Sequence, residues 1–158
     1  MTATTTSSAV LVLADGTRFE GRAYGSVGRS VGTLRLDVAP TGYLETLTDP
    51  KVAGEIVVFA TPHIGATGVN DEDAVSSRIE AAGLVVRDPA RRVSNFRATR
   101  SLDDDLARDE VVGISGIDTR ALTRRIAAAD SPLRAGIFSG ADAQLSDAEL
   151  ATIVNTAA

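Results

Sequence analysis

The chain has 158 residues, of which 44% are hydrophobic and 4% aromatic, and its formal net charge is −5 at pH 7. This length fits one domain with a core made mainly of Val, Leu, Ile and Ala. The acidic balance argues against nucleic-acid binding, because proteins that bind phosphate backbones present basic faces. The absence of cysteine excludes disulfides and thiolate chemistry and favours a cytoplasmic protein.

The start of the chain shows no targeting signal. The sequence MTATTTSSAV lacks the positive charge and the apolar run of a signal peptide, and no stretch of the chain approaches the roughly 20 apolar residues of a membrane span. We therefore expect no membrane association. Residues 1–8 are small and hydroxyl-rich, which predicts a disordered tail. Residues 9–158 are expected to form a single domain.

Strand patterns dominate the first half of the chain. The apolar run Ala9–Leu13 and the stretch Thr17–Tyr24 flank an Ala-Asp-Gly turn and predict a β-hairpin. Further strands are predicted at Thr33–Val38 and in GEIVVFATP, and TGYLETLTDP predicts a short helix that ends before Pro50. The glycines at 25, 28 and 32 do not have the GxGxxG spacing of a dinucleotide site, so we assign them to close turns.

Helices alternate with strands in the second half. GLVVRD, VVGIS and PLRAGIFS predict strands, and a helix is predicted from about Ser101. GIDTRALTRRIAAA predicts a helix with Asp118 as N-cap and with Leu122 and Ile126 on its apolar face. SDAELATIVNTAA predicts a last helix with Ser146 as N-cap and a glutamate three residues later, the pattern of a capping box. This succession indicates an α/β or α+β fold.

The only histidine, His63, lies in TPHIGATGVNDED. A histidine that activates a nucleophile needs a Ser, Cys or Thr and normally an orienting carboxylate, and this spacing does not indicate such a group. A zinc site needs three or four ligands, and this chain offers only carboxylates beside His63. We therefore interpret His63 as a loop residue with local contacts, and we predict neither a catalytic residue nor a metal site.

Several sequence blocks occur in an order that resembles a known family. LVLADGTRFEGRAYG, TGYLETLTDP, TPHIGATGVND, GLVVRD, SNFR and GIDTRALTR are together similar to the N-terminal domain of the small, glutamine-hydrolysing subunit of carbamoyl phosphate synthetase. The resemblance runs from about Val10 to Phe138. It implies an α/β fold of the swivelling β/β/α type.

The resemblance also implies a function. In that family the domain precedes a class I amidotransferase domain, which holds a cysteine nucleophile and is absent from these 158 residues. The implied role is non-catalytic: packing against the large synthetase subunit and a glutaminase domain during glutamine-dependent carbamoyl phosphate synthesis, for the pyrimidine and arginine pathways. The chain itself would hold no cofactor, because ATP and glutamine would belong to the parent complex.

Some positions depart from the family pattern. The resemblance places a glutamine-contacting serine after Thr-Asp-Pro, where this chain has Lys51. Thr33, Arg35 and Asp37 differ from the usual strand sequence, and Val75 stands where an acidic residue is expected. These differences leave two hypotheses open: the scaffold domain of a small subunit or paralogue, and a stand-alone binding or regulatory module that has lost glutamine chemistry.

Two arginines are candidates for an interface. Arg120 and Arg124 are four residues apart on one face of the predicted helix. They are either solvated and paired with surface acids, or they meet carboxylates of a neighbouring domain or subunit. Without a synthetase partner, the same face could form a homodimer.

Overall fold

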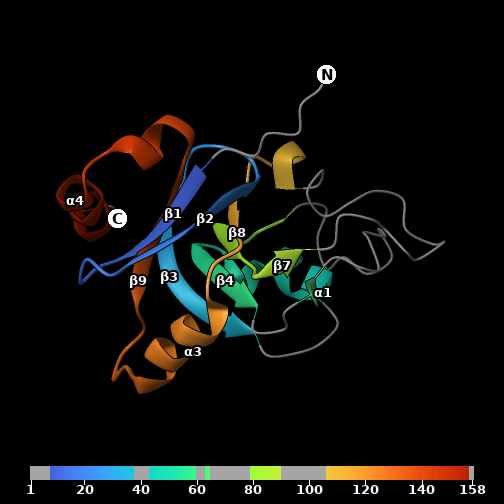
Figure 1. Ribbon diagram of the computed structural model, residues 1–158. Coiled ribbons are helices and arrows are strands. Elements are labelled where there is room, and N and C mark those ends of the chain that lie inside the picture. The colour runs from blue at the N-terminus through green and yellow to red at the C-terminus, as the bar shows by residue number, and fades with distance from the viewer. Residues whose placement is uncertain (1–7, 38–42, 60–62, 65–78, 90–105, 157–158) are drawn as a thin grey trace.

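The computed structural model describes residues 8–37, 43–59, 63–64, 79–89 and 106–156, which are coloured in Figure 1. Seven strands close into a barrel in the order β1-β2-β8-β6-β4-β3-β9. Their bounds are β1 (Ser8–Leu13), β2 (Arg18–Gly25), β3 (Arg29–Asp37), β4 (Glu55–Phe59), β6 (Gly83–Val85), β8 (Val112–Ser115) and β9 (Arg134–Ser139). This combination of a mixed sheet with helices confirms the α/β class.

The barrel has a parallel and an antiparallel part. Strands β3, β4, β6 and β8 are neighbours and run parallel. Strands β1, β2 and β9 close the remainder through antiparallel pairs. Because β4, β6 and β8 are adjacent and parallel, their carboxyl ends meet at one end of the barrel.

Apolar residues on both faces of the strands explain the long hydrophobic runs in the sequence. In β1, Leu11 and Leu13 lie in the barrel interior, whereas Val10 and Val12 belong to a cluster outside it. Successive side chains of a strand point to opposite faces, so a run of consecutive apolar residues fits a strand that is covered on both sides.

The predicted β-hairpin is confirmed. β1 and β2 pair with Leu11 opposite Phe19, and Gly16 has a φ of +93° in the turn. Thr17 donates its backbone N–H to Asp15 Oδ1 at 2.8 Å, and Arg125 Nη2 lies 2.5 Å from Asp15 Oδ2. The hydrogen bonds from Thr17, with a smaller contribution from Arg125, lower the pKa of Asp15. The turn is therefore attached to the helix that carries Arg125.

Helix α4 (Asp147–Thr156) covers the outside of β1 and β9 (Figure 1). Its residues Leu150 and Val154 are fully buried in a cluster with Val10, Val12 and Phe138. At its start, Ser146 accepts a hydrogen bond from the Glu149 backbone at 3.2 Å, which confirms the predicted N-cap.

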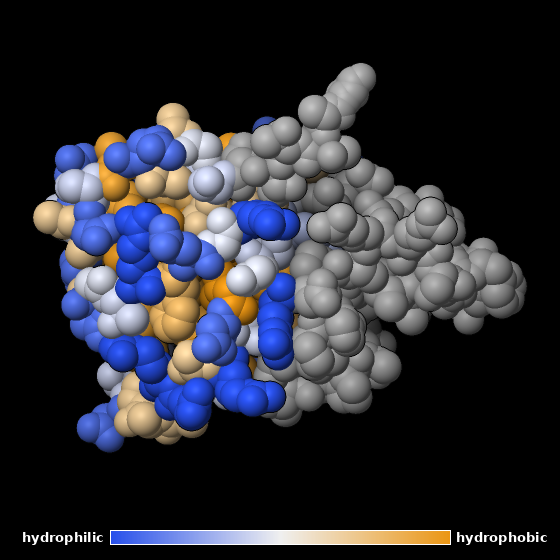
Figure 2. Space-filling view, in the orientation of Figure 1, coloured by the Kyte–Doolittle hydropathy of each residue, from blue (hydrophilic) through white to orange (hydrophobic). Residues whose placement is uncertain are grey.

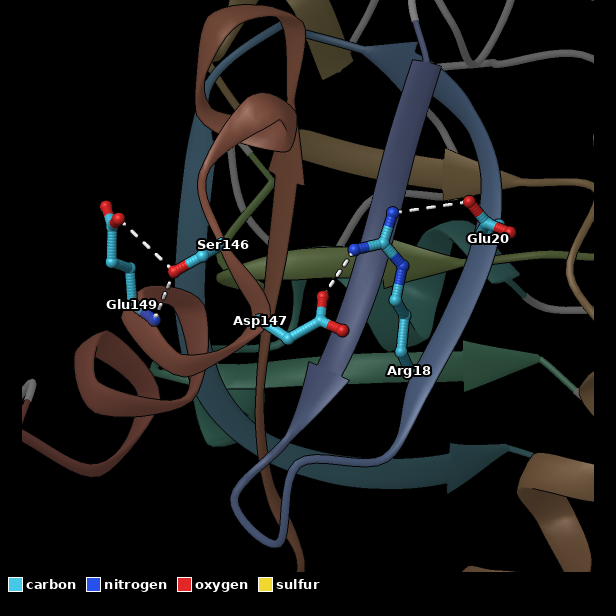
Figure 3. A network of polar contacts seen from close by, with 5 residues as sticks. All are labelled: Arg18, Glu20, Ser146, Asp147 and Glu149. Atoms are coloured by element: carbon cyan, nitrogen blue, oxygen red, sulfur yellow. Dashed lines mark hydrogen bonds and ion pairs between the residues drawn. The ribbon is translucent and has the colours of Figure 1, made fainter.

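Ion pairs connect the start of α4 to β2. Arg18 Nη1 lies 2.5 Å from Asp147 Oδ1, and Arg18 Nη2 lies 3.2 Å from Glu20 Oε1 (Figure 3). These side chains are substantially exposed, so each pair contributes no more than about 1 kcal/mol. Packing of the apolar face therefore holds α4 in place, and the ion pairs orient its first turn.

The opposite side of the barrel is covered by short elements. α1 (Tyr43–Thr48) ends close to Pro50, as predicted, and is followed by the 3-10 turn η1 (Pro50–Val52). Leu47 and Val52 from these elements pack with Phe59 and Leu84 in a second outer cluster. On the side of α4, a further 3-10 turn, η3 (Gly140–Gln144), contacts β1 and connects β9 to α4.

Helix α3 (Thr119–Ala128) lies against β3 and β4. Asp118 Oδ1 accepts a hydrogen bond from the Ala121 backbone at 3.0 Å, so the predicted N-cap is confirmed. Leu122 is fully buried in the interior cluster, and Ile126 packs against the same cluster. The apolar face of α3 therefore contributes to the barrel core.

Several boundaries differ from the sequence-based predictions. β3 begins at Arg29, four residues before the predicted start, because Arg29–Thr33 pairs with β9. The strand predicted for GLVVRD ends at Val85, and Asp88–Pro89 forms a separate short strand β7. Of the helix predicted from about Ser101, residues 101–105 lie outside the described ranges, and residues 106–108 are helical. Residues 1–7 and Val75 lie outside them.

Gly32 is a strand residue and not the turn residue that its spacing predicts. A Cβ atom at this position would lie 2.5 Å from the backbone oxygen of Gly54. The strand can approach the turn before β4 only because residue 32 has no side chain.

Among the described residues, no helix is long and apolar enough to cross a membrane.

Gly32→Ala is expected to lower the free energy of unfolding by about 1–3 kcal/mol, because the backbone at Gly54 must shift to admit the methyl group. Urea unfolding followed by circular dichroism measures this difference. Ala14→Gly, a change of one methyl group at a partly buried position at the edge of the outer cluster beneath α4, serves as a size control. Unchanged stability of Gly32→Ala would contradict the close approach of these two segments.

Candidate functional site

An open cleft of about 640 Å³ lies where β6 and β8 end and α3 begins. Its described lining consists of Arg87, Gly116, Ile117, Asp118, Arg120 and Arg124. Arg87 follows β6 and Gly116 follows β8, so the cleft is at the carboxyl ends of two adjacent parallel strands. In α/β folds with parallel strands, both barrels and open sheets, this is the end at which ligands bind, because the loops after neighbouring strands converge there.

Backbone hydrogen bonds fix the two loops that form the cleft. Val86 donates its N–H to the Ile114 carbonyl at 3.0 Å, and Gly116 donates to the Arg87 carbonyl at 2.9 Å. The chain therefore stays paired beyond the last residue of β6. Gly116 has a φ of +80°, and the turn that it makes leads directly into Asp118 and α3.

Helix α3 places two further arginines at the cleft. Arg120 and Arg124 are exposed and four residues apart, which is about one helical turn, so they share one face. Leu122 points into the barrel from the same helix and fixes its rotation. Asp118 is the only acidic residue in the described lining, and its Oδ1 is engaged as the N-cap of α3.

The three arginines of the cleft differ from most others in the described part of the chain. Arg18, Arg29, Arg35, Arg108 and Arg125 each form an ion pair with an Asp or Glu. Within the described ranges, no such pair involves Arg87, Arg120 or Arg124. Figure 2 shows strongly hydrophilic side chains over α3 and over the loop that leads into it. The cleft is therefore a local concentration of positive charge on a chain of negative net charge.

Lys51 lies at a different place in the fold. It is exposed on η1, and its backbone N–H donates to Asp49 Oδ1 at 3.0 Å. η1 precedes the amino end of β4, whereas the cleft follows the carboxyl ends of the parallel strands β6 and β8. The structure thus brings Arg120 and Arg124 together with Arg87, and it places Lys51 at the opposite end of these strands.

His63 belongs to the short strand β5 (His63–Ile64), which pairs with β7 (Asp88–Pro89) in parallel. This differs from the predicted loop, and the register sets His63 opposite Asp88. Among the described residues there is no group of three His, Cys, Asp or Glu side chains that could hold a metal ion. The acidic stretch Asp71–Asp73 lies outside these ranges.

The sequence identifies two of the three arginines of the cleft. Arg120 and Arg124 are visible as an i, i+4 pair, whereas Arg87 is separated from them by more than thirty residues. A signal for Arg87 does exist, because it directly follows the buried segment Leu84–Val86. Charged residues at the carboxyl ends of predicted parallel strands are candidates for a shared site.

Comparison with known proteins identifies a family. Residues 11–135 match the family described as carbamoyl-phosphate synthase small chain, CPSase domain. The chain is 58% identical over 132 residues to the carbamoyl phosphate synthase small chain of Streptomyces coelicolor, an alignment that covers 84% of this chain and 34% of that protein. It is 53% identical over 148 residues to the protein of the same name from Corynebacterium glutamicum, covering 92% and 37% of the two chains.

A third relative extends the alignment along this chain. The carbamoyl phosphate synthase small chain of Corynebacterium diphtheriae is 48% identical over 158 residues, which cover 99% of this chain and 41% of that protein. Among solved structures, a peptidase M28 precursor from Shewanella amazonensis gives a TM-score of 0.43 with 13% identity, covering 84% of this chain and 34% of that one. That structural likeness is too weak to support any conclusion.

The chain therefore spans between a third and about two fifths of the length of the curated relatives that it matches. The matched part includes the strands that form the cleft and most of the barrel. The family match covers well over half of the chain, and the chain belongs to the carbamoyl-phosphate synthase small chain family, of which it contains the CPSase domain.

Proposed function

We propose that this chain is a non-catalytic scaffold domain in glutamine-dependent carbamoyl phosphate synthesis, where it packs against a large synthetase subunit and a glutaminase domain. The observation that carries the proposal is the identity of 58% over 132 residues with a protein named carbamoyl phosphate synthase small chain. The lack of cysteine supports a non-catalytic role, because glutamine hydrolysis in this family uses a cysteine thiolate.

The finer features of the proposal follow from the same family. The barrel with its covering helices supports the swivelling β/β/α type. ATP and glutamine would be bound by the other parts of the complex, in the cytoplasm, and the product would enter pyrimidine and arginine synthesis. If no synthetase partner is present, the face that packs against it would form a homodimer instead.

Complex formation tests this proposal. Size-exclusion chromatography with light scattering is applied to the chain alone and mixed with the large synthetase subunit from the same organism, both at tens of micromolar. We expect a complex with the large subunit, since a stable interface of about 1,200–2,000 Å² requires only one face of a domain of this size. A chain that stays strictly monomeric beside the large subunit would contradict the scaffold role.

A second candidate function is a stand-alone binding or regulatory module that keeps the fold. It is favoured by Lys51, because the family resemblance places a glutamine-contacting serine there. The long cation is exposed in the middle of η1, and a domain docked over it would have to provide a partner for a buried ammonium group. This candidate predicts that the chain does not improve glutamine use by a glutaminase domain.

The substitution Lys51→Ser tests whether residue 51 impairs glutamine turnover. In a reconstituted pair with a competent glutaminase domain, we expect the substitution to raise glutamine turnover, because the serine hydroxyl requires no compensating charge. Ammonia release is measured for both versions, and Arg18→Ala, which removes an exposed cation beside the start of α4, serves as a control. Equal turnover of Lys51→Ser and the unsubstituted chain would show that residue 51 does not affect the glutamine site.

A further inference from the structure

We infer that the cleft of Arg87, Arg120 and Arg124 receives carboxylate side chains from a protein that packs against this domain. This inference rests on the proposed function and specifies the chemistry of the contact. It names an acidic segment of the partner as the occupant of the cleft. The charge of the cleft, the exposure of its arginines and its position in the fold support this occupant.

The cleft carries an excess of positive charge. Among the described residues that line it, three guanidinium groups stand against one carboxylate, Asp118, and that carboxylate already accepts the N-cap hydrogen bond of α3. Like charges four residues apart on a helix destabilise it slightly, so the pair Arg120 and Arg124 is unfavourable without a counter-charge. Elsewhere in the described part of the chain, five arginines have an acidic neighbour within ion-pair distance. The cleft is therefore complementary to an anion.

The geometry of the arginine side chain favours a carboxylate or a phosphate as the bound anion. A guanidinium group presents planar, paired N–H donors that match the two oxygens of a carboxylate or two oxygens of a phosphate. Arg120 and Arg124 lie side by side on α3, and Arg87 approaches from the end of β6. Donors that come from two separate elements can engage more than one carboxylate of a folded or extended acidic segment.

Exposure favours a protein over a small anion. All three arginines are exposed, and the cleft of about 640 Å³ is open to solvent. Sites for small molecules are largely preformed and bury most of the ligand surface, whereas the polar rim of a protein interface is exposed until the partner arrives. The side chains of this cleft are thus arranged as interface residues, and a second protein surface would supply the burial that they lack.

The position of the cleft is compatible with this role. It lies beyond the carboxyl ends of β6 and β8, at the end opposite to Lys51. The backbone around it is held by the hydrogen bonds of Val86 and Gly116 and by Leu122 in the core. A fixed backbone with exposed arginines allows a partner to dock without rearrangement of the fold.

The test measures the affinity of the full chain for the large synthetase subunit and, separately, for the glutaminase domain, by biolayer interferometry at low and high salt. Arg87→Ala, Arg120→Ala and Arg124→Ala are each compared with Arg125→Ala, an exposed arginine of the same helix that pairs with Asp15 outside the cleft. We expect each cleft substitution to weaken one of the two complexes about tenfold, the factor that corresponds to 1.4 kcal/mol, and Arg125→Ala to leave both affinities unchanged.

Two further readouts separate charge recognition from a structural effect. The salt dependence of the affinity should become weaker in the cleft variants, because fewer ion pairs form in the complex. Arg120→Lys should recover part of the affinity, since it keeps the charge and loses the paired donors. Circular dichroism and thermal unfolding of each variant should match the unsubstituted chain.

The possible outcomes decide between the proposals. Equal binding by the cleft variants and the unsubstituted chain would overturn this inference and leave the proposed function intact. If the unsubstituted chain binds neither the large synthetase subunit nor the glutaminase domain, both this inference and the proposed function are overturned. Micromolar binding of inorganic phosphate to the isolated chain, measured by calorimetry and lost in the same variants, would assign the cleft to a small anion and also overturn the inference.

Discussion

Replacing Leu122 with alanine is expected to lower the free energy of unfolding by about 2–5 kcal/mol, the usual cost of such a truncation in a core. Leu122 is fully buried and packs in the barrel interior with residues such as Ile114 and Ile137. α3 has ten residues, a length at which an isolated helix is marginal in water, so the helix depends on this packing.

Urea unfolding of Leu122→Ala measures this loss. Val27→Ala is the matched control, because Val27 is an aliphatic side chain that is 55% exposed, and its truncation should change stability by less than about 0.5 kcal/mol. If Leu122→Ala is as stable as the control, α3 does not contribute to the barrel core. In that case the placement of Arg120 and Arg124 at the cleft would also lose its support.

The sequence predicts features that depend on neighbouring residues. Asp118 is recognisable as an N-cap because a side-chain acceptor directly before an apolar i, i+4 pattern is sufficient to identify one. The β1–β2 hairpin is recognisable in the same way, because its turn residues lie between two strand patterns. Each of these elements is specified within about fifteen residues of the chain.

Features that depend on distant segments are not predictable in this way. The closed order of the seven strands arises from pairs such as β1 with β9, which are more than a hundred residues apart. The spacing of Gly32 indicates a turn, because the sequence does not show that Gly54 approaches it. Arg87 does not stand out for the same reason, since its proximity to Arg120 is created by the parallel pairing of β6 with β8.

Successive residues of β9 point into and out of the barrel, and truncation of an outward-pointing residue is expected to lower stability as strongly as truncation of Leu122. Phe138→Ala is expected to lower the free energy of unfolding by about 3–5 kcal/mol, the range for loss of a buried phenylalanine. Phe138 is fully buried against Leu150 and Val154 of α4. A Cβ atom at Gly136 would lie 2.7 Å from its ring, so the glycine two residues earlier provides the space that the ring fills.

The neighbouring residue Ile137 is the control that separates the two layers. It points into the barrel and belongs to the interior cluster, whereas Phe138 belongs to the cluster beneath α4. Hydrogen exchange should therefore show a preferential loss of protection in α4 for Phe138→Ala, while Ile137→Ala, with an expected cost of about 2–5 kcal/mol, should lower protection in the barrel strands.

The ion pair between Arg18 and Asp147 does not compensate for the loss of the Phe138 ring. Both side chains are substantially exposed, and such a pair contributes no more than about 1 kcal/mol. Apolar burial thus stabilises this contact more than the ion pair does, and Asp147→Asn should leave the protection of α4 nearly unchanged. If Asp147→Asn and Phe138→Ala reduced this protection equally, the helix would be held mainly by its first turn and the assignment of the outer cluster as its anchor would be wrong.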